Sequence, residues 1–385
     1  MRPWQIMELC ILLAPGFLIL WRVRFCRRPT GAPGAWSPPS FSVIVPARNE
    51  AHRLPLLLES LRNQTLMPAE VLVVDDASTD GTAAVAAEAG CRVISPGDKP
   101  PGWLGKTWAC WVGASNAAAP LLLFLDADTR LDPAGCERIL QERQVQGGVI
   151  TVQPWHHAPR WTEKLSSFFN VIVMAAINTF TAFGQRLTPG GCFGPCILCA
   201  RNEYFRIDGH RAVRGSILED LDLGRGFLDA GIPVRCRAGK GTINFRMYPE
   251  GIRELVDGWS KNMAGGARGA HPLVLLLIAL WISGCASAAF FAVWWILSGN
   301  TTAAIEGAGF YLLYAGQLLW MYRRIGSFGP QSALLFPVHL AFFMFVFLRS
   351  LVLTFLVKRV SWKGRIIRIQ SPGSPPQPRD LERRP

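Results

Sequence analysis

The chain has 385 residues, of which 50% are hydrophobic and 17% are charged, and its formal net charge at pH 7 is +13. Soluble domains contain about 25% charged residues, so this deficit and a mean hydropathy of +0.22 predict that part of the chain lies in lipid. The basic residues gather at the ends of apolar runs, which is typical of membrane flanks and excludes a groove-binding stripe for nucleic acid.

The first predicted element is an apolar segment over residues 4–21, which is just long enough to cross a bilayer. Its basic stretch, RVRFCRR, follows the apolar run, whereas a secretory signal peptide carries its positive charges before that run. We therefore expect residues 1–28 to form an uncleaved anchor with its N-terminus outside the cell. Residues 29–40 are rich in Pro and Gly and are predicted to be a linker into a cytoplasmic domain.

Residues 41–245 alternate short apolar runs with helical stretches. The predicted strands are FSVIVP, EVLVVDD, CRVIS, LLLFLDAD and GVITVQP. Near-continuous apolar strands are buried on both faces, so this pattern predicts an α/β domain with a mainly parallel sheet. Ligands bind beyond the carboxyl ends of the strands in such sheets, where Asp75, Asp76, Asp126 and Asp128 are expected to lie.

Acidic residues follow two of these strands, and Glu219 and Asp220 in SILEDLDLG add a third group. Carboxylates brought together in this way need a cation and hydrogen-bond donors. We expect Asp126 and Asp128 to lie on an extended segment, which points both side chains to the same face. Because Mg²⁺ or Mn²⁺ is held by one or two carboxylates plus phosphate oxygens, the pattern predicts transfer from a nucleotide-diphosphate donor.

Four stretches in chain order, SVIVPARNE, VLVVDDASTDGT, LLLFLDADT and ILEDLDLG, resemble the family 2 glycosyltransferases with the GT-A (Rossmann-like) fold over roughly residues 41–260. The resemblance implies that Asp76 hydrogen-bonds the uracil ring of a UDP-sugar. Pro46, Ala47 and Glu50 would line the same pocket.

The same resemblance assigns the metal and the chemistry. Asp126 and Asp128 would hold Mg²⁺ or Mn²⁺, with Asp128 as the more direct ligand and Asp126 also near the donor. Asp220 resembles the general base of an inverting displacement. Glu219 beside it is a candidate substrate-binding residue, with plain surface charge as the alternative.

Three further stretches, at residues 101–110, 192–210 and 245–262, are similar to the group of bacterial 4,4′-diaponeurosporenoate and hopanoid-associated glycosyltransferases. This implies a multi-pass enzyme of the cell membrane that moves one sugar, expected to be glucose, to a carotenoid acid or another polyisoprenoid. Lys106 would contact the donor phosphates, unless it is an exposed loop lysine. Trp259 occupies the place of the Trp in the Gln-x-x-Arg-Trp motif of processive relatives, whose Gln and Arg are missing here. A processive polysaccharide synthase and an inactive membrane scaffold are the alternatives.

Residues 246–270 contain an amphipathic helix with apolar residues at helical spacing, including Leu255, Trp259 and Met263. One interpretation packs this face into the core. We expect the other, an interfacial helix whose Trp259 faces the acceptor entrance.

Residues 271–358 contain three apolar segments long enough to span a bilayer, at 272–297, 304–322 and 332–357. Residues 165–183 contain Asn170 and Asn178 and are predicted to be an interfacial or buried helix. Three spans after a cytoplasmic domain would place the basic, Pro-rich tail 359–385 outside, against the positive-inside rule. Either one segment is re-entrant or the assignment of 165–183 is wrong.

The remaining polar side chains have modest expected roles. The cluster Cys192, Cys196 and Cys199 lacks a second ligand pair and is expected to consist of packed thiols. His156 and His157 are expected to cap an element or face solvent. His210 is a candidate for lining the acceptor site, and the sequence does not decide whether it does.

Overall fold

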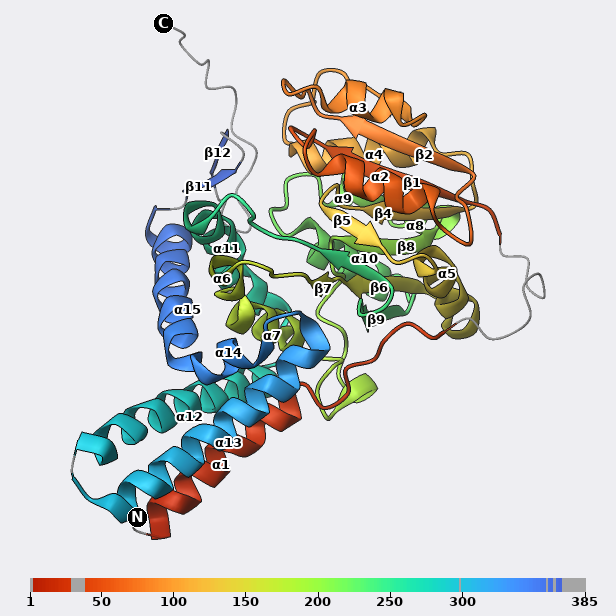
Figure 1. The fold of residues 1–385 in the computed structure, drawn as a ribbon. Coiled ribbons are helices and arrows are strands. Elements are labelled where there is room, and N and C mark those ends of the chain that lie inside the picture. The colour runs from red at the N-terminus through yellow and green to blue at the C-terminus, as the bar shows by residue number, and fades with distance from the viewer. Residues whose placement is uncertain (1–2, 29–38, 298, 358, 363–364, 369–385) are drawn as a thin grey trace, which may run out of the picture.

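The computed structural model describes all residues except 1–2, 29–38, 298, 358, 363–364 and 369–385 (Figure 1). Nearly all of the predicted linker and most of the predicted tail therefore lie outside the described residues.

The centre of the molecule is a seven-stranded sheet with the strand order β3-β2-β1-β4-β8-β6-β9. All neighbouring pairs are parallel except those of β8, which runs antiparallel to β4 and β6. The predicted α/β domain with a mainly parallel sheet is confirmed. The strands are β1 (Phe41–Ala47), β2 (Glu70–Asp75), β3 (Arg92–Ile94), β4 (Leu121–Leu125), β6 (Val149–Gln153), β8 (Cys196–Ala200) and β9 (Val234–Ala238).

Both faces of this sheet are buried, because consecutive side chains of each strand enter different cores. Val43 and Val45 of β1 pack on the side of α2, α3 and α5, whereas Ile44 packs against α4 on the other side. The helices on these two faces are α2 (Leu54–Arg62), α3 (Thr82–Glu88), α4 (Gly105–Asn116), α5 (Gly135–Gln146) and α10 (Glu219–Asp229).

A smaller sheet continues from the end of β4 and has the order β5-β10-β7. Its strands are β5 (Thr129–Leu131), β7 (Trp155–His156) and β10 (Ile243–Phe245). The other short elements are α6 (Trp161–Lys164), α8 (Arg201–Arg206), α9 (Gly209–Ala212), the 3₁₀ turns 184–186 and 267–269, and the hairpin of β11 (Arg359–Trp362) and β12 (Arg365–Arg368).

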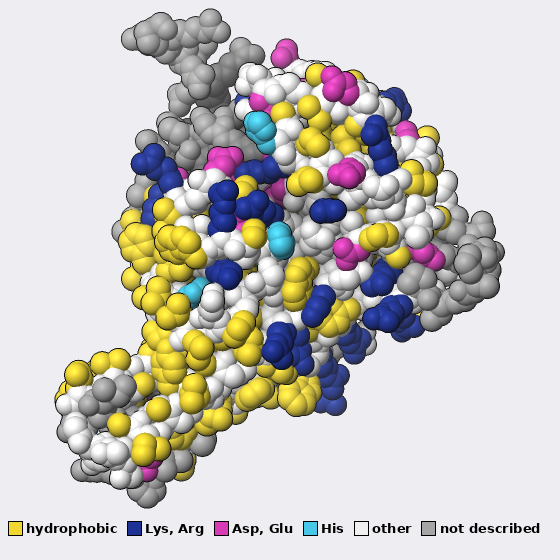
Figure 2. All heavy atoms as spheres, viewed as in Figure 1, with side chains coloured by type: hydrophobic (Ala, Val, Ile, Leu, Met, Phe, Trp, Pro, Cys, Tyr) yellow, Lys and Arg dark blue, Asp and Glu magenta, His cyan; other side chains and the backbone are white. Residues whose placement is uncertain are grey.

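Three helices pack side by side into an arm that extends away from the α/β domain (Figure 1). They are α1 (Pro3–Ile19), α12 (Pro272–Leu297) and α13 (Thr301–Ile325). Gln317 of α13 ties the three helices together, since it accepts a hydrogen bond from Trp281 Nε1 at 3.0 Å and donates one to the Leu13 carbonyl at 2.7 Å. Apolar side chains cover the outside of the arm (Figure 2).

The arm is fixed to the sheet directly after α1. The Ala238 N–H of β9 donates to the Arg24 carbonyl at 2.8 Å, and Phe25 forms a parallel bridge with Ala238. The chain leaving α1 therefore joins the edge of the seven-stranded sheet before the sequence reaches β1.

Two helices in the described part of the chain are long and apolar enough to cross a membrane, Pro272–Trp294 and Phe336–Thr354. Neither α1 nor α13 is among them, so the predicted spans over 4–21 and 304–322 are not confirmed. The predicted segment 332–357 is divided into α14 (Gly329–Leu334), α15 (Phe336–Leu351) and a π-helical turn over 352–357. In Figure 1, α15 runs along the body of the molecule and not along the arm.

The segment predicted as an interfacial or buried helix forms α7 (Ser167–Ala176), whose Phe168, Phe169 and Asn170 are buried. Helix α11 (Ile252–Gly266) packs against α7 and α15. Its Trp259 is only 6% exposed, stacks on Phe169 and donates from Nε1 to Ser166 Oγ at 3.0 Å. The expectation that Trp259 faces an open acceptor entrance is therefore wrong, because α11 buries its apolar face against two helices.

Candidate active site

The loops that follow β1 and β2 are held together by hydrogen bonds between backbone and side chains. The N–H groups of Asn49 and Glu50 donate to Ser78 Oγ and Thr82 Oγ1, each at 2.9 Å. The two loops therefore form one wall at the carboxyl edge of the sheet.

The residues predicted to bind the nucleotide base lie in this wall. The Asp76 N–H donates to the Ala47 carbonyl at 2.9 Å, and the Asp76 carboxylate is 3.5 Å from Arg48 Nη1. Asp76 is buried at 9% exposure, and Pro46 and Ala47 form the end of β1 beside it. The structure thus brings Pro46, Ala47, Glu50 and Asp76 to one end of neighbouring strands.

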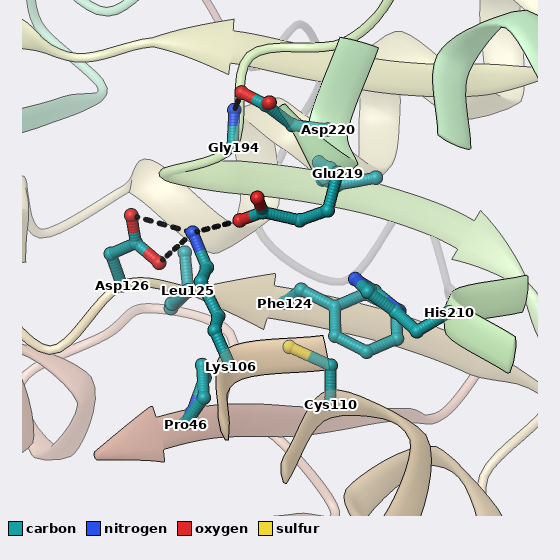
Figure 3. A pocket seen from close by; sticks show the side chains of 11 residues that line it. Pro46, Lys106, Cys110, Phe124, Leu125, Asp126, Gly194, His210, Glu219 and Asp220 are labelled. Atoms are coloured by element: carbon teal, nitrogen blue, oxygen red, sulfur yellow. Dashed lines mark hydrogen bonds and ion pairs between the residues drawn. The ribbon is translucent and has the colours of Figure 1, made fainter. Parts of the chain in front are cut away.

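A lysine joins two of the predicted acidic groups (Figure 3). Lys106 Nζ lies 2.9 Å from Asp126 Oδ1 and 3.2 Å from Glu219 Oε1. Burial alone lowers the pKa of Lys106, but the two carboxylates outweigh it and raise that pKa well above its usual range. Lys106 is the second residue of α4 and only partly exposed, which rules out the exposed loop lysine. Glu219 is likewise an ion-pair partner and not a free surface charge.

Asp126 and Asp128 do not lie on an extended segment, so the predicted extended geometry is wrong. The carbonyl of Asp126 accepts hydrogen bonds from the Thr129 N–H at 3.1 Å and from Thr129 Oγ1 at 2.7 Å. These bonds close a turn between β4 and β5. Asp126 faces Lys106, while burial and the nearby Asp126 and Glu50 carboxylates raise the pKa of Asp128 to about 7, which Arg53 partly offsets.

The carboxylates at this turn fit a divalent cation that shares its ligands with a bound anion. Negative charge around Asp128 exceeds what Arg53 compensates, and a cation would remove that excess. In the described part of the chain, no group of three or more His, Cys, Asp or Glu side chains gathers closely enough to hold a metal alone. Phosphate oxygens or water would therefore have to complete the ligands of an ion bound by Asp126 and Asp128.

Asp220 lies in the first turn of α10, where the helix dipole favours a negative charge. Its Oδ2 accepts a hydrogen bond from the Gly194 N–H at 2.8 Å, and its Oδ1 accepts one from the Leu221 N–H at 3.0 Å. Burial and the neighbouring Glu219 nevertheless raise the pKa of Asp220 to about 6. Asp220 can thus accept a proton near neutral pH while its backbone bonds hold it in place.

One narrow pocket contains most of these groups (Figure 3). Its walls include Pro46, Lys106, Asp126, Glu219 and Asp220, which come from four separate stretches of the chain. His210 lines the same pocket beside Phe124, and its Nδ1 is 2.9 Å from the Tyr204 hydroxyl. Trp259 does not line this pocket.

Several contributors to the site could not be identified from the sequence. Arg53 pairs with Glu254 of α11 at 2.6 Å and with Glu50 at 3.6 Å, and the only sequence signal is the three-residue spacing of Glu50 and Arg53 at a helix start. Gly194 lies in the cysteine-rich stretch and carries no signal for its contact with Asp220. A Cβ at Gly194 would lie 2.9 Å from Asp220 Oδ2, so only glycine leaves room for this bond.

The remaining histidine and cysteine predictions have mixed outcomes. Cys192, Cys196 and Cys199 are buried, as packed thiols would be. His157 is exposed, whereas His156 is fully buried and its Nδ1 is 2.9 Å from Asn170 Nδ2. Burial lowers the pKa of His156 to about 4, so the expectation that it caps an element or faces solvent is wrong.

The chain is similar to several known proteins. The family model "Glycosyl transferase family 2" matches residues 42–217. Two 4,4′-diaponeurosporenoate glycosyltransferases, from Staphylococcus aureus (strain USA300) and Staphylococcus haemolyticus, are 33% and 34% identical over 330 and 331 residues. Each alignment covers 85% of this chain and 88% of the relative.

Among solved structures, a mannosyltransferase from Pyrobaculum calidifontis in complex with GDP-Man and Mn²⁺ has a similar fold. Its TM-score is 0.52 at 17% identity, and the match covers 92% of this chain and 98% of that chain. This likeness concerns the fold alone, and it agrees with the predicted GT-A-like α/β architecture.

Proposed function

This chain belongs to the family 2 glycosyltransferases, and we propose that it moves one sugar from a UDP-sugar to a carotenoid acid or a similar polyisoprenoid in a membrane. The observation that carries the proposal is the meeting of Lys106, Asp126, Glu219 and Asp220 in one pocket at the carboxyl edge of the sheet. The proposed acceptor class is taken from the 4,4′-diaponeurosporenoate glycosyltransferases, which align with 85% of the chain.

The donor would lie along the wall formed by the loops after β1 and β2. Asp76 would accept hydrogen bonds from the uracil ring, with Pro46, Ala47 and Glu50 around it. Lys106 would exchange part of its pairing with Asp126 and Glu219 for contacts with the diphosphate, since an ammonium is a good point-charge partner for phosphate.

Asp126 and Asp128 would hold Mg²⁺ or Mn²⁺ together with the diphosphate oxygens. Such an ion stabilises negative charge on the departing diphosphate. The turn at Asp126–Thr129 fixes the spacing of the two carboxylates through the bonds of Thr129 to the Asp126 carbonyl.

Asp220 would take the proton of a hydroxyl acceptor. Its raised pKa matches work near neutral pH, and Gly194 and Leu221 keep its carboxylate in place. A carboxylic-acid acceptor is already ionised at neutral pH and needs no base. With such an acceptor, Asp220 would mainly orient the nucleophile.

Lys106→Met is expected to lower the affinity for the donor by about tenfold and to move the acid limb of the pH–rate profile upward. The affinity falls because the contact with the diphosphate is lost, and a tenfold loss of affinity corresponds to about 1.4 kcal/mol of binding free energy. The acid limb moves because Lys106 lowers the pKa of Asp220. Steady-state kinetics with a hydroxyl acceptor from pH 5 to pH 8 measures both. Lys106→Arg keeps the charge and should lose less, and an unchanged pH profile in Lys106→Met would contradict this role.

The membrane part of the proposal rests on the apolar surface of the helices. Exposed apolar side chains cover the arm, including Phe290, Trp294 and Leu313, and they continue over α15 at Val338 and Phe345 (Figure 2). A contiguous apolar surface of this extent is rare on a soluble protein. We propose that α1, α12 and α13 cross the bilayer together and that the α/β domain is cytoplasmic.

Helix α15 would not cross but would lie with its exposed apolar side in the membrane surface. One side packs on α7 and α11 through Phe343 and Ser350, whose Oγ donates to the Ser260 carbonyl at 2.7 Å. The following strand β11 contacts α11, on the side of the α/β domain. Three crossings then leave the basic tail on the cytoplasmic side, which removes the conflict with the positive-inside rule.

A topology test follows from this arrangement. Thr302 lies in the first turn of α13 at the far end of the arm, and Ser115 is exposed on α4. In intact cells, a membrane-impermeant maleimide should label Thr302→Cys but not Ser115→Cys, and a fluorescent protein fused after Pro385 should fold and fluoresce in the cytoplasm. Background labelling should be low because all described cysteines except Cys91 are buried. Labelling of Ser115→Cys in intact cells, or a dark fusion, would contradict the topology.

The function itself is tested with the purified full chain in lipid vesicles. UDP-glucose, Mn²⁺ and 4,4′-diaponeurosporenoate should give a product heavier by one hexose in mass spectrometry. Calorimetry should show metal-dependent binding of UDP-glucose. A series of products with increasing sugar number would favour a processive synthase, and the absence of both product and nucleotide-sugar binding would overturn the proposal.

A further inference from the structure

The segment 246–251, which we call the strap, connects β10 to α11. Several side chains fasten it. Arg246 Nη2 pairs with the buried Glu163 at 2.6 Å, and Arg160 Nη1 donates to the Pro249 carbonyl at 2.8 Å. Arg53 Nη2 holds Glu250 at 3.4 Å. The strap is therefore attached both to the α/β domain and to the start of α11.

Tyr248 in the centre of the strap has an unusual backbone conformation. Its φ is 58°, in the left-handed region that a bulky residue rarely adopts. Such a conformation is strained and persists only when the surroundings enforce it. The fastened strap supplies that enforcement, and the result is a fixed direction for the Tyr248 side chain.

The ring of Tyr248 lies against α11 at a glycine. A Cβ at Gly258 would come within 2.1 Å of Tyr248 Cε1 and 2.6 Å of its hydroxyl oxygen, so the ring needs a residue without a side chain there. The same ring meets Trp259 edge to face, with centroids 5.9 Å apart. Trp259 in turn stacks on Phe169, so Tyr248 ends a row of aromatic side chains that leads from the α7–α11 core.

The strap that carries Tyr248 is tied to the candidate site by Arg53. Arg53, which holds Glu250 of the strap at 3.4 Å, also pairs with Glu254 at 2.6 Å and with Glu50 of the predicted nucleotide pocket at 3.6 Å. Within the described part of the chain this hydroxyl forms no hydrogen bond. Tyr248 is partly exposed, its ring lies against α11, and its hydroxyl is a donor without a partner among the described residues.

We propose that Tyr248 is an acceptor-binding residue that places the reacting oxygen of the acceptor beside the donor held at Asp128. This inference rests on the proposed glycosyl transfer. The ligand that matches the residue is an apolar chain ending in an oxygen nucleophile: the ring packs against the last carbons of the chain, and the hydroxyl donates to the terminal oxygen. Neither nucleotide nor diphosphate recognition is assigned to Tyr248.

The test uses the full chain in lipid vesicles with UDP-glucose, Mn²⁺ and 4,4′-diaponeurosporenoate. Tyr248→Ala should raise the KM for the acceptor by about tenfold or more, which corresponds to the loss of one packed ring and one hydrogen bond, and should leave the calorimetric Kd for UDP-glucose unchanged. Tyr248→Phe keeps the ring and loses only the hydrogen bond, so its acceptor KM should rise less than that of Tyr248→Ala.

Gly258→Ala provides a second variant that touches no predicted site residue. Its Cβ would displace the Tyr248 ring, so it should raise the acceptor KM as Tyr248→Ala does. In the double variant the new methyl meets no ring, and the KM should equal that of Tyr248→Ala alone. Gly266→Ala on the same helix is the matched control, because its Cβ would meet no atom within 4 Å.

The outcomes separate this inference from the proposed function. Additive losses for Tyr248→Ala and Gly258→Ala, or an unchanged acceptor KM in Tyr248→Ala, would overturn the role of Tyr248 while transfer by the unaltered chain stands. An equal loss of UDP-glucose binding would instead assign Tyr248 to the donor and also overturn it. If the unaltered chain neither binds UDP-glucose nor transfers sugar, the proposed function fails first.

Discussion

Asp220→Asn should reduce kcat for a hydroxyl acceptor by roughly 10²–10⁴-fold, the usual contribution of a positioned general base. The amide keeps the size of the side chain but cannot take a proton, and its single oxygen can accept from only one of the Gly194 and Leu221 N–H groups, which bond different oxygens of Asp220. For a carboxylate acceptor the loss should be much smaller, because the nucleophile is ionised without help. Parallel assays with a polyisoprenoid alcohol and a polyisoprenoid acid measure the difference.

The pH dependence gives the same assignment an independent readout. Because the pKa of Asp220 is raised to about 6, the rate with a hydroxyl acceptor should fall as the pH is lowered through 6. The folded-state pKa lies above the value of about 3.9 for an unfolded Asp, so this carboxylate makes the protein less stable as the pH rises from about 4 to 6. The melting temperature of Asp220→Asn, measured relative to that of the unaltered chain, should therefore increase as the pH rises from about 4 to 7. Equal losses of turnover with both acceptors, at unchanged donor affinity, would contradict the division of labour.

Asp128→Asn should abolish the metal-dependent part of UDP-sugar binding and lower kcat/KM by a factor of 10³ or more, by analogy with the loss of a group that stabilises charge on a leaving group. The side chain sits among Asp126, Glu50 and Arg53, so removing its charge weakens the attraction for a cation more than it disturbs packing. Calorimetry of UDP-glucose with and without Mn²⁺ measures the effect, with the exposed Asp98→Asn as control.

Two outcomes would contradict the role of Asp128. One is unchanged Mn²⁺ dependence in Asp128→Asn. The other is an equal loss in Asp98→Asn, which would point to surface charge in general. Retained binding of UDP-glucose in the absence of metal would still agree with the wall formed around Asp76, because that part of the site uses no cation.

Sequence patterns predicted β1, β2, β3, β4 and β6 of the seven-stranded sheet, because burial on both faces leaves a strong signal, but they did not predict β8 and β9. The runs that end at Asp75 and Leu125 are apolar at nearly every position, and they form β2 and β4 as expected. Strand β8 was not expected, since its residues lie in the cysteine-rich stretch whose short apolar run has no flanking helix to mark it. Its antiparallel direction also departs from strict strand–helix alternation.

Predictions for individual site residues succeeded where a side chain lies at the end of a strand or in the first turn of a helix, and failed where tertiary contacts decide its position. Lys106, Asp126, Glu219 and Asp220 share one pocket, as their places in the sequence suggested. The turn at Asp126 depends on the hydrogen bonds of Thr129, which no periodicity reveals. Trp259 has the spacing of an amphipathic helix whether lipid or protein covers it, and only its contacts with Phe169 and Ser166 distinguish the two.

The junction of Phe25 with Ala238 has a consequence for the substrates that can react. If the arm crosses the bilayer as proposed, this junction would hold the sheet that carries the candidate site at one set height above the lipid, because the contact precedes residues 29–38 in the chain. The polar end of a lipid substrate would then have to reach from the membrane surface to the height of the site, while its hydrocarbon chain stays in the bilayer. Selection between lipids would depend on how far each can lift its head group, in addition to the chemistry of that group.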